Sequence, residues 1–186
     1  MNDKQIRPLL LELLRSRDPL AAIFEELPIC RGDGRADVVS VNGAMYGYEI
    51  KGSNDTTRRL SKQIVDYERV FDYCVIVATQ NHLDRAREIV PLYWGIVVVH
   101  ETNFGPTMKQ VRAAKRNRHT DPEAIMRLMW RREAVKSLRR CGISIESTAL
   151  ISHVWDVMVK AVSPKTIADE VRTALKARGG YGFPVM

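Results

Sequence analysis

The pair Asn42-Gly43 stands between two short runs of β-prone residues, and it limits how this chain can fold more than any other feature. The runs cover residues 37–41 and 45–51, and an Asn-Gly pair between such runs is the strongest local signal for a β-hairpin. Two later apolar runs, Tyr73–Ala78 and Tyr93–Val99, have the length of buried strands. We therefore expect a sheet that contains the hairpin and both later strands.

The length of the hairpin loop decides which side chains share a face of the sheet. A two-residue turn would pair Val41 with Ala44. In that register the side chains of Asp37 and Glu49 would point to opposite faces. A three-residue loop would pair Val41 with Met45 instead. It would also place Asp37 directly opposite Glu49, with about 5 Å between their Cβ atoms. The sequence leaves both registers open, and a metal site needs an odd-length loop or a bulge.

Segments with apolar residues at helical spacing separate the expected strands. The expected helical segments are Arg7–Leu14, Pro19–Leu27, a helix that follows an N-cap at Asn54 or Asp55 and ends near Val70, and His82–Val90. The resulting order is helix, strand, strand, helix, strand, helix, strand, which is typical of a mixed sheet with helices on its faces. We therefore expect an α/β fold for residues 1–105.

After Gly105-Pro106 the sequence carries no further strand signal, so we expect residues 106–186 to form a helical extension. The expected helices are Pro122–Arg140, Ser147–Val162 and Pro164–Ala177, the last of them capped by Ser163 and ended by Gly179-Gly180. A separate helix-turn-helix DNA reader is the least favoured interpretation, because residues 147–177 lack a convincing short glycine turn.

The expected extension is strongly basic. Residues 109–140 contain eleven Lys and Arg residues but only three acidic residues. The whole chain has a formal net charge of +7, a balance that favours contact with a polyanion. We therefore expect Arg131 and Arg132 to contact nucleic acid. The alternative is that these charges form a solvated helix face.

Cysteine usage and the absence of long apolar stretches favour the cytoplasm. The three cysteines are odd in number, far apart and never in a C-x-x-C pair, so we expect neither a disulfide framework nor a zinc knuckle. Residues 1–14 lack the uninterrupted apolar core of a signal peptide. No stretch reaches the roughly 18 apolar residues of a membrane span. We expect a cytoplasmic protein that makes no contact with a membrane.

Glu49 and Lys51 stand two apart on the second strand of the hairpin, so their side chains project from the same face. Hydrolysis of a phosphodiester with a divalent metal needs hard oxygen ligands and a group that orients or deprotonates the attacking water. Asp37, Glu49 and the carbonyl of Ile50 would supply the ligands. Lys51 would act on the water. The alternative is an ordinary ion pair on a solvated strand.

A polar stripe on the following helix adds to this set. Arg59, Gln63 and Tyr67 stand four apart, so their side chains line one side of the helix. Arg58 and Arg59 open this helix beside the expected site and would meet substrate phosphates. The alternative is an amphipathic surface helix with no part in catalysis.

As a set, these residues resemble the motif of the PD-(D/E)XK nuclease superfamily. The likeness covers residues 26–99 and runs through Glu26-Leu27, Arg35-Ala36-Asp37, Gly47-Tyr48-Glu49-Ile50-Lys51, Asp55, Arg59-Leu60, Gln63, Tyr67 and Trp94-Gly95. The Q-x-x-x-Y helix is similar to that of the RecB and lambda-exonuclease branch, and the whole set is closer to small bacterial and phage members. Ala36 stands where the name of the motif has proline, which many members lack.

The resemblance implies a restriction-endonuclease-like fold and a metal-dependent nuclease. In that superfamily the acids at the positions of Asp37 and Glu49 bind Mg²⁺ or Mn²⁺, and the lysine, here Lys51, assists the water. The helix Gln and Tyr position metal ligands or substrate phosphate, which implies catalytic roles for Gln63 and Tyr67. A glutamate on the first helix often adds a metal contact, and Glu26 is the matching residue in this sequence.

The implied substrate is DNA, with RNA as the alternative, and a homodimer would provide two active sites for cutting both strands. The superfamily also includes proteins that keep the fold and do not cut. The alternative function is therefore a catalytically silent protein of this fold, which binds nucleic acid or a protein partner in a phage or defence context. The implied location is the cytoplasm of a bacterial or phage-infected cell.

Overall fold

Six strands form one mixed sheet in the computed structural model, which describes residues 1–56 and 58–179. In sheet order they are β1 (Ala22–Ile29), β2 (Gly34–Asn42), β3 (Ala44–Lys51), β4 (Tyr73–Thr79), β5 (Gly95–Thr102) and β6 (Gly105–Arg112). β1, β2 and β3 are antiparallel, β3, β4 and β5 are parallel, and β6 is antiparallel to β5. The expectation of a mixed sheet is confirmed.

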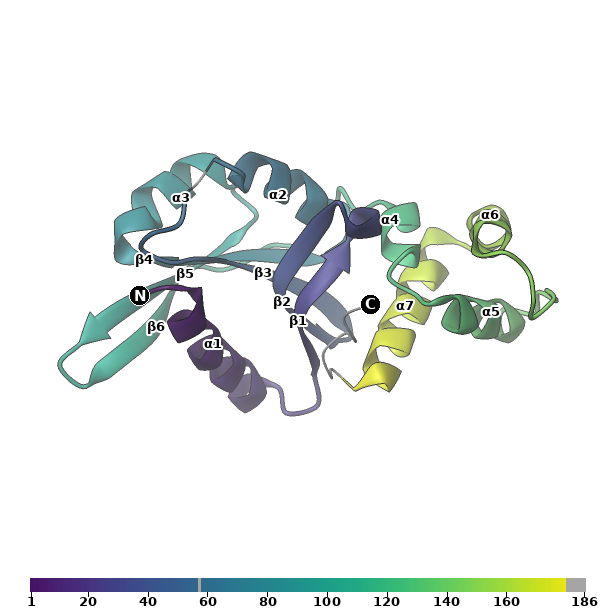
Figure 1. The fold of residues 1–186 in the computed structure, drawn as a ribbon, viewed down its shortest axis with the longest axis horizontal. Coiled ribbons are helices and arrows are strands. Elements are labelled where there is room, and N and C mark those ends of the chain that lie inside the picture. Colours follow the sequence, from purple (N-terminus) through teal and green to yellow (C-terminus); the bar gives the residue numbers. More distant parts are fainter. Residues whose placement is uncertain (57, 180–186) are drawn as a thin grey trace.

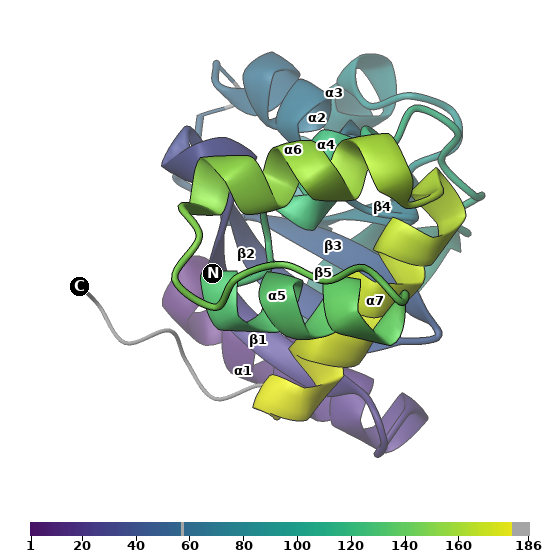
Figure 2. The same ribbon diagram turned by 90° about the vertical axis from the view of Figure 1, so that its right-hand side faces the viewer.

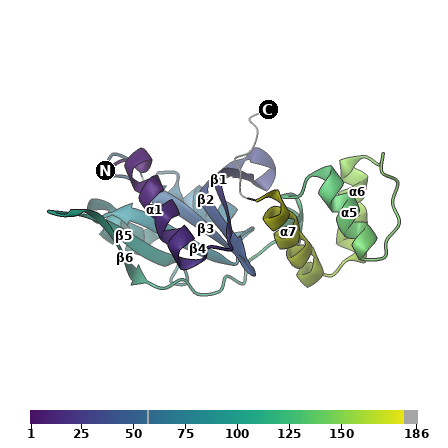
Figure 3. The same cartoon turned by 90° about the horizontal axis from the view of Figure 1, so that it is seen from below.

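Helices cover both faces of this sheet (Figure 1, Figure 3). The first three are α1 (Asp3–Arg17), α2 (Leu60–Glu68) and α3 (Leu83–Ile89). α1 crosses one face, where its residues Leu10 and Leu14 share a core with Val38 and Val77. α2 and α3 cover the other face, where Tyr67 belongs to a larger core. The fold is therefore α/β, with the sheet between helices.

The β2–β3 hairpin has the register of the three-residue loop. Val41 pairs with Met45, and Asn42 pairs with Ala44. Gly43 forms the tip with a φ of 71°, a left-handed conformation that glycine adopts without a steric penalty. The longer of the two predicted loops is therefore correct.

The segment Pro19–Leu27, which we expected to be helical, instead belongs largely to β1. Phe24 and Leu27 both face the core, and this spacing of three residues resembles a helix. The spacing arises because Glu26 has a φ of 55°, which interrupts the alternation of a regular strand. β1 pairs with β2 on both sides of Glu26. The helix prediction is wrong for this segment. The separate helix prediction for Arg7–Leu14 is confirmed, because these residues lie within α1.

β6 is a strand that the sequence did not indicate, and it lies inside the expected helical extension. Most of its residues are exposed, because β6 is an edge strand in the described sheet and follows β5 at its end. A polar edge strand lacks the apolar alternation that identifies a half-buried strand. The β5–β6 hairpin projects beyond the neighbouring strands (Figure 1). The expected boundary between residues 105 and 106 therefore falls inside this hairpin.

α2 begins later than predicted. Its N-cap is Arg59, whose side chain makes no capping hydrogen bond. The carboxylate of Asp55 instead accepts a hydrogen bond from the amide of Gly52 at 2.7 Å. The predicted cap is therefore wrong, although a helix does follow the hairpin. β4, α3 and β5 lie within three residues of their predicted bounds.

Four helices follow the sheet in the described part of the chain. They are α4 (Pro122–Met126), α5 (Arg131–Arg140), α6 (Ile151–Ala161) and α7 (Pro164–Arg178). α7 contacts β1 and β2, whereas α5 and α6 lie farther from the sheet, on the outer side of α7 (Figure 1, Figure 2). None of the described helices is long and apolar enough to cross a membrane.

The predicted bounds of these helices need two corrections. The expected single helix Pro122–Arg140 is two helices, α4 and α5. The carboxylate of Glu133 accepts a hydrogen bond from the amide of Trp130, and this contact caps the start of α5. The helix expected from Ser147 begins at Ile151. α7 has the predicted start, with Ser163 as N-cap and proline at the first turn, and Gly179 ends it with a φ of 74°. Gly180 lies outside the described residues.

Candidate active site

A cavity of about 530 Å³ lies between the end of β3, the start of β2 and the N-terminal ends of α1 and α2. Every residue expected to act in catalysis or metal binding lines it: Glu26, Asp37, Glu49, Ile50, Lys51, Gln63 and Tyr67. Seven acidic side chains line the cavity, and only four basic ones do. The cavity is therefore acidic although the chain as a whole is basic.

The carboxylate of Glu49 is the buried centre of this cavity. Glu49 is 1% exposed, and Lys51 is 7% exposed. The Nζ atom of Lys51 donates to Oε1 of Glu49 at 2.6 Å and to Oε1 of Gln63 at 3.0 Å. The side-chain amide of Gln63 also donates to Oε1 of Glu49, at 2.6 Å. Because both charged groups are buried, the interpretation as an ion pair on a solvated strand is wrong.

The hydroxyl of Tyr67 connects the two expected metal ligands. It donates to Oε2 of Glu49 at 2.8 Å and accepts a hydrogen bond from the amide of Asp37 at 3.2 Å. Burial raises the pKa of Tyr67 well above its usual value, and the charges of Glu49 and Asp37 raise it further. The hydroxyl therefore keeps the proton that it donates. The predicted stripe of Gln63 and Tyr67 faces the site and not the solvent.

Asp37 shares a face with Glu49, as the longer hairpin loop predicts. Its Oδ2 atom accepts a hydrogen bond from the amide of Ile50 at 2.7 Å. Burial raises the pKa of Asp37 to about 7, and the charge of Glu49 adds to this effect. Because the negative charge of Glu49 lies close to Asp37, a cation between the two carboxylates would be stabilising.

Glu26 lies on β1 and not on a helix, so the element that the resemblance implied for it is wrong. The β1–β2 pairs on either side place Glu26 opposite Asp37. Its φ of 55° is left-handed, which is uncommon for a residue other than glycine. Its carboxylate binds the guanidinium groups of Arg35 and Arg7, with Nη2 of Arg7 at 2.6 Å. Glu26 therefore lines the cavity, but from an edge strand.

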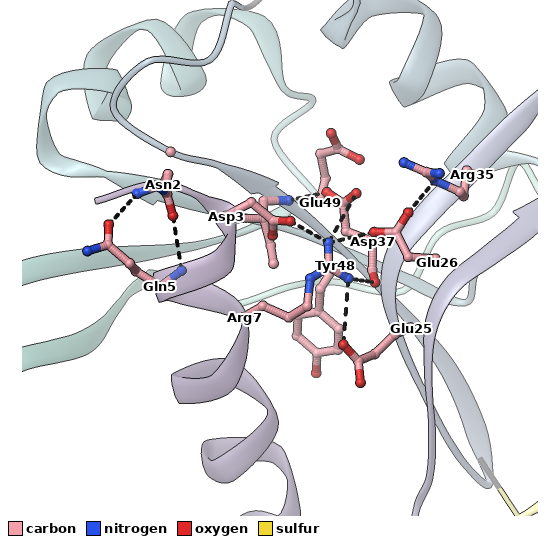
Figure 4. A network of polar contacts seen from close by, with 12 residues as sticks. Asn2, Asp3, Gln5, Arg7, Glu25, Glu26, Arg35, Asp37, Tyr48 and Glu49 are labelled. Carbon is pink, nitrogen blue, oxygen red and sulfur yellow. Dashed lines mark hydrogen bonds and ion pairs between the residues drawn. The ribbon is translucent and has the colours of Figure 1, made fainter. Parts of the chain in front are cut away.

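Two residues of α1 belong to this site, and the sequence interpretation missed both (Figure 4). Asp3 lines the cavity, and its Oδ2 atom accepts a hydrogen bond from Nη2 of Arg7 at 2.7 Å. The four-residue spacing of Asp3 and Arg7 would have indicated this helical ion pair. No local pattern indicated that the same guanidinium also binds Glu26, which lies on a strand.

The oxygen donors fit a divalent cation that takes few ligands from the protein. Among the described residues, no three His, Cys, Asp or Glu side chains gather closely enough to form a metal-ligand cluster. Mg²⁺ in phosphoryl-transfer sites commonly takes one or two carboxylates and completes its shell with water and substrate phosphate. Asp37 and Glu49 supply two carboxylates, and Ile50 lines the cavity beside them. The acid excess of the cavity also favours a cation.

The four arginines expected to contact nucleic acid lie in two places. Arg59 lines the cavity, and Arg58 is exposed next to it. Arg131 and Arg132 begin α5 and are not among the described residues that line the cavity. The guanidinium of Arg131 donates to the carbonyl of Ser147, so it holds the segment before α6. The structure therefore brings Arg59 to the site and leaves the α5 pair outside it.

Comparisons with known proteins relate the chain to a phage protein. No solved structure matches it significantly. A protein of Enterobacteria phage P4 named Protein cII is 22% identical over 180 residues, which are 96% of this chain and 68% of that protein. The family model described as Bacteriophage P4 protein cII matches residues 1–181. Because this match spans nearly the whole sequence, the chain belongs to the bacteriophage P4 protein cII family.

Proposed function

We propose that this chain is a metal-dependent nuclease of the PD-(D/E)XK superfamily and that its sheet is a restriction-endonuclease-like core. One observation carries the proposal: the side chains of Asp37, Glu49 and Lys51 converge in one acidic cavity. Gln63 and Tyr67 bind the same central carboxylate. Two hard carboxylates beside an amine match what metal-assisted hydrolysis of a phosphodiester requires.

The proposed cofactor is Mg²⁺ or Mn²⁺, held by Asp37, Glu49 and the carbonyl of Ile50. When bound, the ion would supply a Lewis acid for the scissile phosphate and for the attacking water. The charge of Glu49 already acts on Asp37, whose pKa is raised to about 7. A divalent cation would favour the ionised form of Asp37, which is the form that binds a metal.

The protein's own side chains would orient the reactants. The ammonium of Lys51 has three N–H donors, and two of them are directed to Glu49 and Gln63. The third is left for the attacking water or for a phosphate oxygen. Gln63 and Tyr67 hold opposite oxygens of Glu49, so its carboxylate keeps one orientation. Preorganised groups of this kind lower the barrier because they need little rearrangement during the reaction.

The proposed substrate is DNA. Arg58 and Arg59 are exposed beside the cavity and would bind backbone phosphates, and such contacts position a nucleic acid without reading its sequence. Arg132 is exposed on the more distant α5 and would extend the basic surface. RNA is the alternative substrate. A homodimer would provide the second site needed to cut both strands, and the proposed location is the cytoplasm of a phage-infected bacterial cell.

A cleavage assay with matched variants tests the proposal. The purified protein is incubated with linear, circular and single-stranded DNA and with single-stranded RNA, in Mg²⁺, in Mn²⁺ and in EDTA. We expect metal-dependent cleavage that is lost in Asp37→Asn, Glu49→Gln and Lys51→Met. Asp33→Asn is the matched control, because Asp33 lines the same cavity but is exposed, and this variant should still cut. Equal cleavage by all four variants would show that another site, or a contaminant, is responsible.

The second candidate is a catalytically silent protein of the same fold that binds nucleic acid or a protein partner. One observation favours it: protein donors already occupy both carboxylate oxygens of Glu49. That carboxylate is therefore satisfied without a metal. Binding to DNA that survives in Glu49→Gln and Lys51→Met, with no cutting by the unaltered protein in either metal, would favour this candidate over the nuclease.

A further inference from the structure

We propose that Arg7 supplies a fixed positive charge in place of a second metal ion, so that the site binds one divalent cation and not two. This inference rests on the proposed metal site at Asp37 and Glu49. It concerns a residue of α1 that lies outside the motif of the hairpin and the following helix. Arg7 acts here as a positioning residue, because it contacts the acids of the site and not the reacting atoms.

One nitrogen of Arg7 lies at the point where three carboxylates meet (Figure 4). Its Nη2 atom is 2.7 Å from Oδ2 of Asp3 and 2.6 Å from Oε1 of Glu26. The same atom is 3.9 Å from Oδ1 of Asp37. The other terminal nitrogen, Nη1, donates to the backbone carbonyl of Asp37 at 2.5 Å. One guanidinium therefore joins a helix, an edge strand and the strand that carries the proposed ligand.

Burial distinguishes this guanidinium from a surface ion pair. The side chain of Arg7 is 12% exposed, whereas those of Asp3 and Glu26 are 40% and 38% exposed. Burial alone would lower the pKa of Arg7, yet the hydrogen bond to Asp3 and the charges of Asp3, Glu26 and Asp37 more than compensate and leave the pKa raised. Arg35, which also binds Glu26, is 65% exposed and lies on the solvent side. Of the two arginines that bind Glu26, Arg7 is therefore the buried one.

The charge of Arg7 disfavours a second divalent ion at this point. Asp3 and Glu26, the acids that would have to hold that ion, already bind this guanidinium. Glu49 is instead paired with Lys51. A second divalent ion would stand beside the positive charge of Arg7, and the two would repel each other while Arg7 remains in place.

Asp3, Glu26 and Asp37 lie near one another, yet they do not form a metal-ligand cluster among the described residues. The position of Arg7 explains this. The guanidinium occupies the space between them and holds Asp37 almost 4 Å from the shared nitrogen. Oδ1 of Asp3 is buried and has no hydrogen-bond partner in the described structure, so it is an unused oxygen beside this point. If the guanidinium were removed, Asp3 and Glu26 would be free to close on a metal ion.

The number of Mn²⁺ ions bound by the unaltered protein is the first test. Equilibrium dialysis followed by metal analysis, together with electron paramagnetic resonance of free Mn²⁺, measures this number without any substrate or cleavage. We expect saturation at one ion per chain. Saturation at two ions would overturn the inference and leave the proposed metal site intact. Binding of no ion would overturn the proposed metal site itself, and the inference with it.

Substitution of Arg7 is the second test. We expect Arg7→Gln to bind a second Mn²⁺ and Arg7→Lys, which keeps the charge, to bind one. The double variant Arg7→Gln with Glu26→Gln should return to one ion, because the second ion loses a ligand. Arg35→Gln is the matched control and should remain at one. An Arg7→Gln protein that is folded by circular dichroism and still binds one ion with unchanged affinity would overturn the inference.

Discussion

The ammonium of Lys51 lies 2.6 Å from the carboxylate of Glu49, and neither residue is more than 7% exposed. A buried ion pair stabilises a protein little relative to a well-packed apolar pair, because both charges are removed from water. Removal of one partner is costly, because the other charge then stays buried without compensation. This asymmetry leads to a prediction about the stability of the site.

We predict that Lys51→Met lowers the free energy of unfolding by about 3 kcal/mol. The double variant Lys51→Met with Glu49→Gln should recover most of this loss, because no uncompensated charge remains. Urea denaturation at pH 7.5 in EDTA measures both effects. Lys62→Met is the matched control, since Lys62 is 67% exposed and its Nζ atom is 3.6 Å from Asp66. That variant should lose about 1 kcal/mol or less. A double variant no more stable than Lys51→Met would contradict the prediction.

The raised pKa of Asp37 predicts how stability depends on pH. Its pKa is about 7 in the folded chain, and its ordinary value is 3.8. The folded state therefore holds a proton that the unfolded state releases, and this contribution to stability is complete below pH 4. It is lost as the pH rises from about 4 through 7. Ionised Asp37 thus weakens the folded protein at neutral pH when no divalent metal is present.

We predict that Asp37→Asn raises the free energy of unfolding by about 1–3 kcal/mol at pH 8 in EDTA, and by much less at pH 5. Denaturation of the variant and of the unaltered protein at several pH values measures the difference. Asp33→Asn is the control, because this exposed acid lines the same cavity. The free energies of unfolding of Asp37→Asn and the unaltered protein should differ more as the pH rises. If their difference stays constant, the pKa of Asp37 is not raised in the folded protein.

The hydroxyl of Tyr67 links the Glu49 carboxylate to the Asp37 amide, which leads to a third prediction. Tyr67→Phe would leave a buried acceptor and a buried donor without their partner, at a cost of about 1–3 kcal/mol. Outer-shell partners of metal ligands also tune metal binding, so we expect Mg²⁺ affinity to fall about 10–100-fold. Urea denaturation and calorimetric titration measure the two effects.

Tyr73→Phe is the control for Tyr67→Phe. The ring of Tyr73 stacks on Tyr46 and is half-buried, and its hydroxyl forms no hydrogen bond within the described structure. Loss of that hydroxyl should change stability by about 0.5 kcal/mol at most. Equal losses in the two variants would mean that the hydroxyl of Tyr67 has no special part in the site.

The elements that could be predicted from the sequence are those whose signal is local. The turn residues Asn42-Gly43 and the continuous apolar run of β4 identify their strands without knowledge of the rest of the fold. The hairpin register stayed open, because both loop lengths are compatible with the turn. The structure has the register of the three-residue loop, in which Val41 pairs with Met45. This register buries both of these apolar side chains fully.

The features that could not be predicted depend on distant partners. β1 looked helical because the left-handed φ of Glu26 shifts its apolar alternation, whereas β1 keeps its pairing with β2 on both sides of Glu26. β6 carries no apolar pattern because it is an exposed edge. The role of Arg7 depends on Glu26 and Asp37, which stand 19 and 30 residues away in the sequence. Spacing rules within one element cannot detect such contacts.

Arg172 of α7 binds Asp72, which precedes β4, and this contact attaches the C-terminal helices to the sheet. The Nη2 atom of Arg172 lies 3.0 Å from each carboxylate oxygen of Asp72. The carboxylate also accepts a hydrogen bond from the amide of Met45 at 2.8 Å, so it is tied to β3 as well. Both side chains are largely buried. Residues from both sides of the expected boundary at 105 therefore depend on one another.

We predict that Arg172→Ala lowers the free energy of unfolding by about 3 kcal/mol, because it leaves the buried charge of Asp72 without its main partner. Lys165→Ala is the control on the same helix, since Lys165 is exposed and pairs with the exposed Asp169, and it should cost about 0.5 kcal/mol. Hydrogen exchange locates the effect: amides of α7 and of β3 should lose protection together in Arg172→Ala. If α7 alone lost protection, the helical part would be an independent unit, and the buried ion pair would not couple it to the strand that carries Glu49 and Lys51.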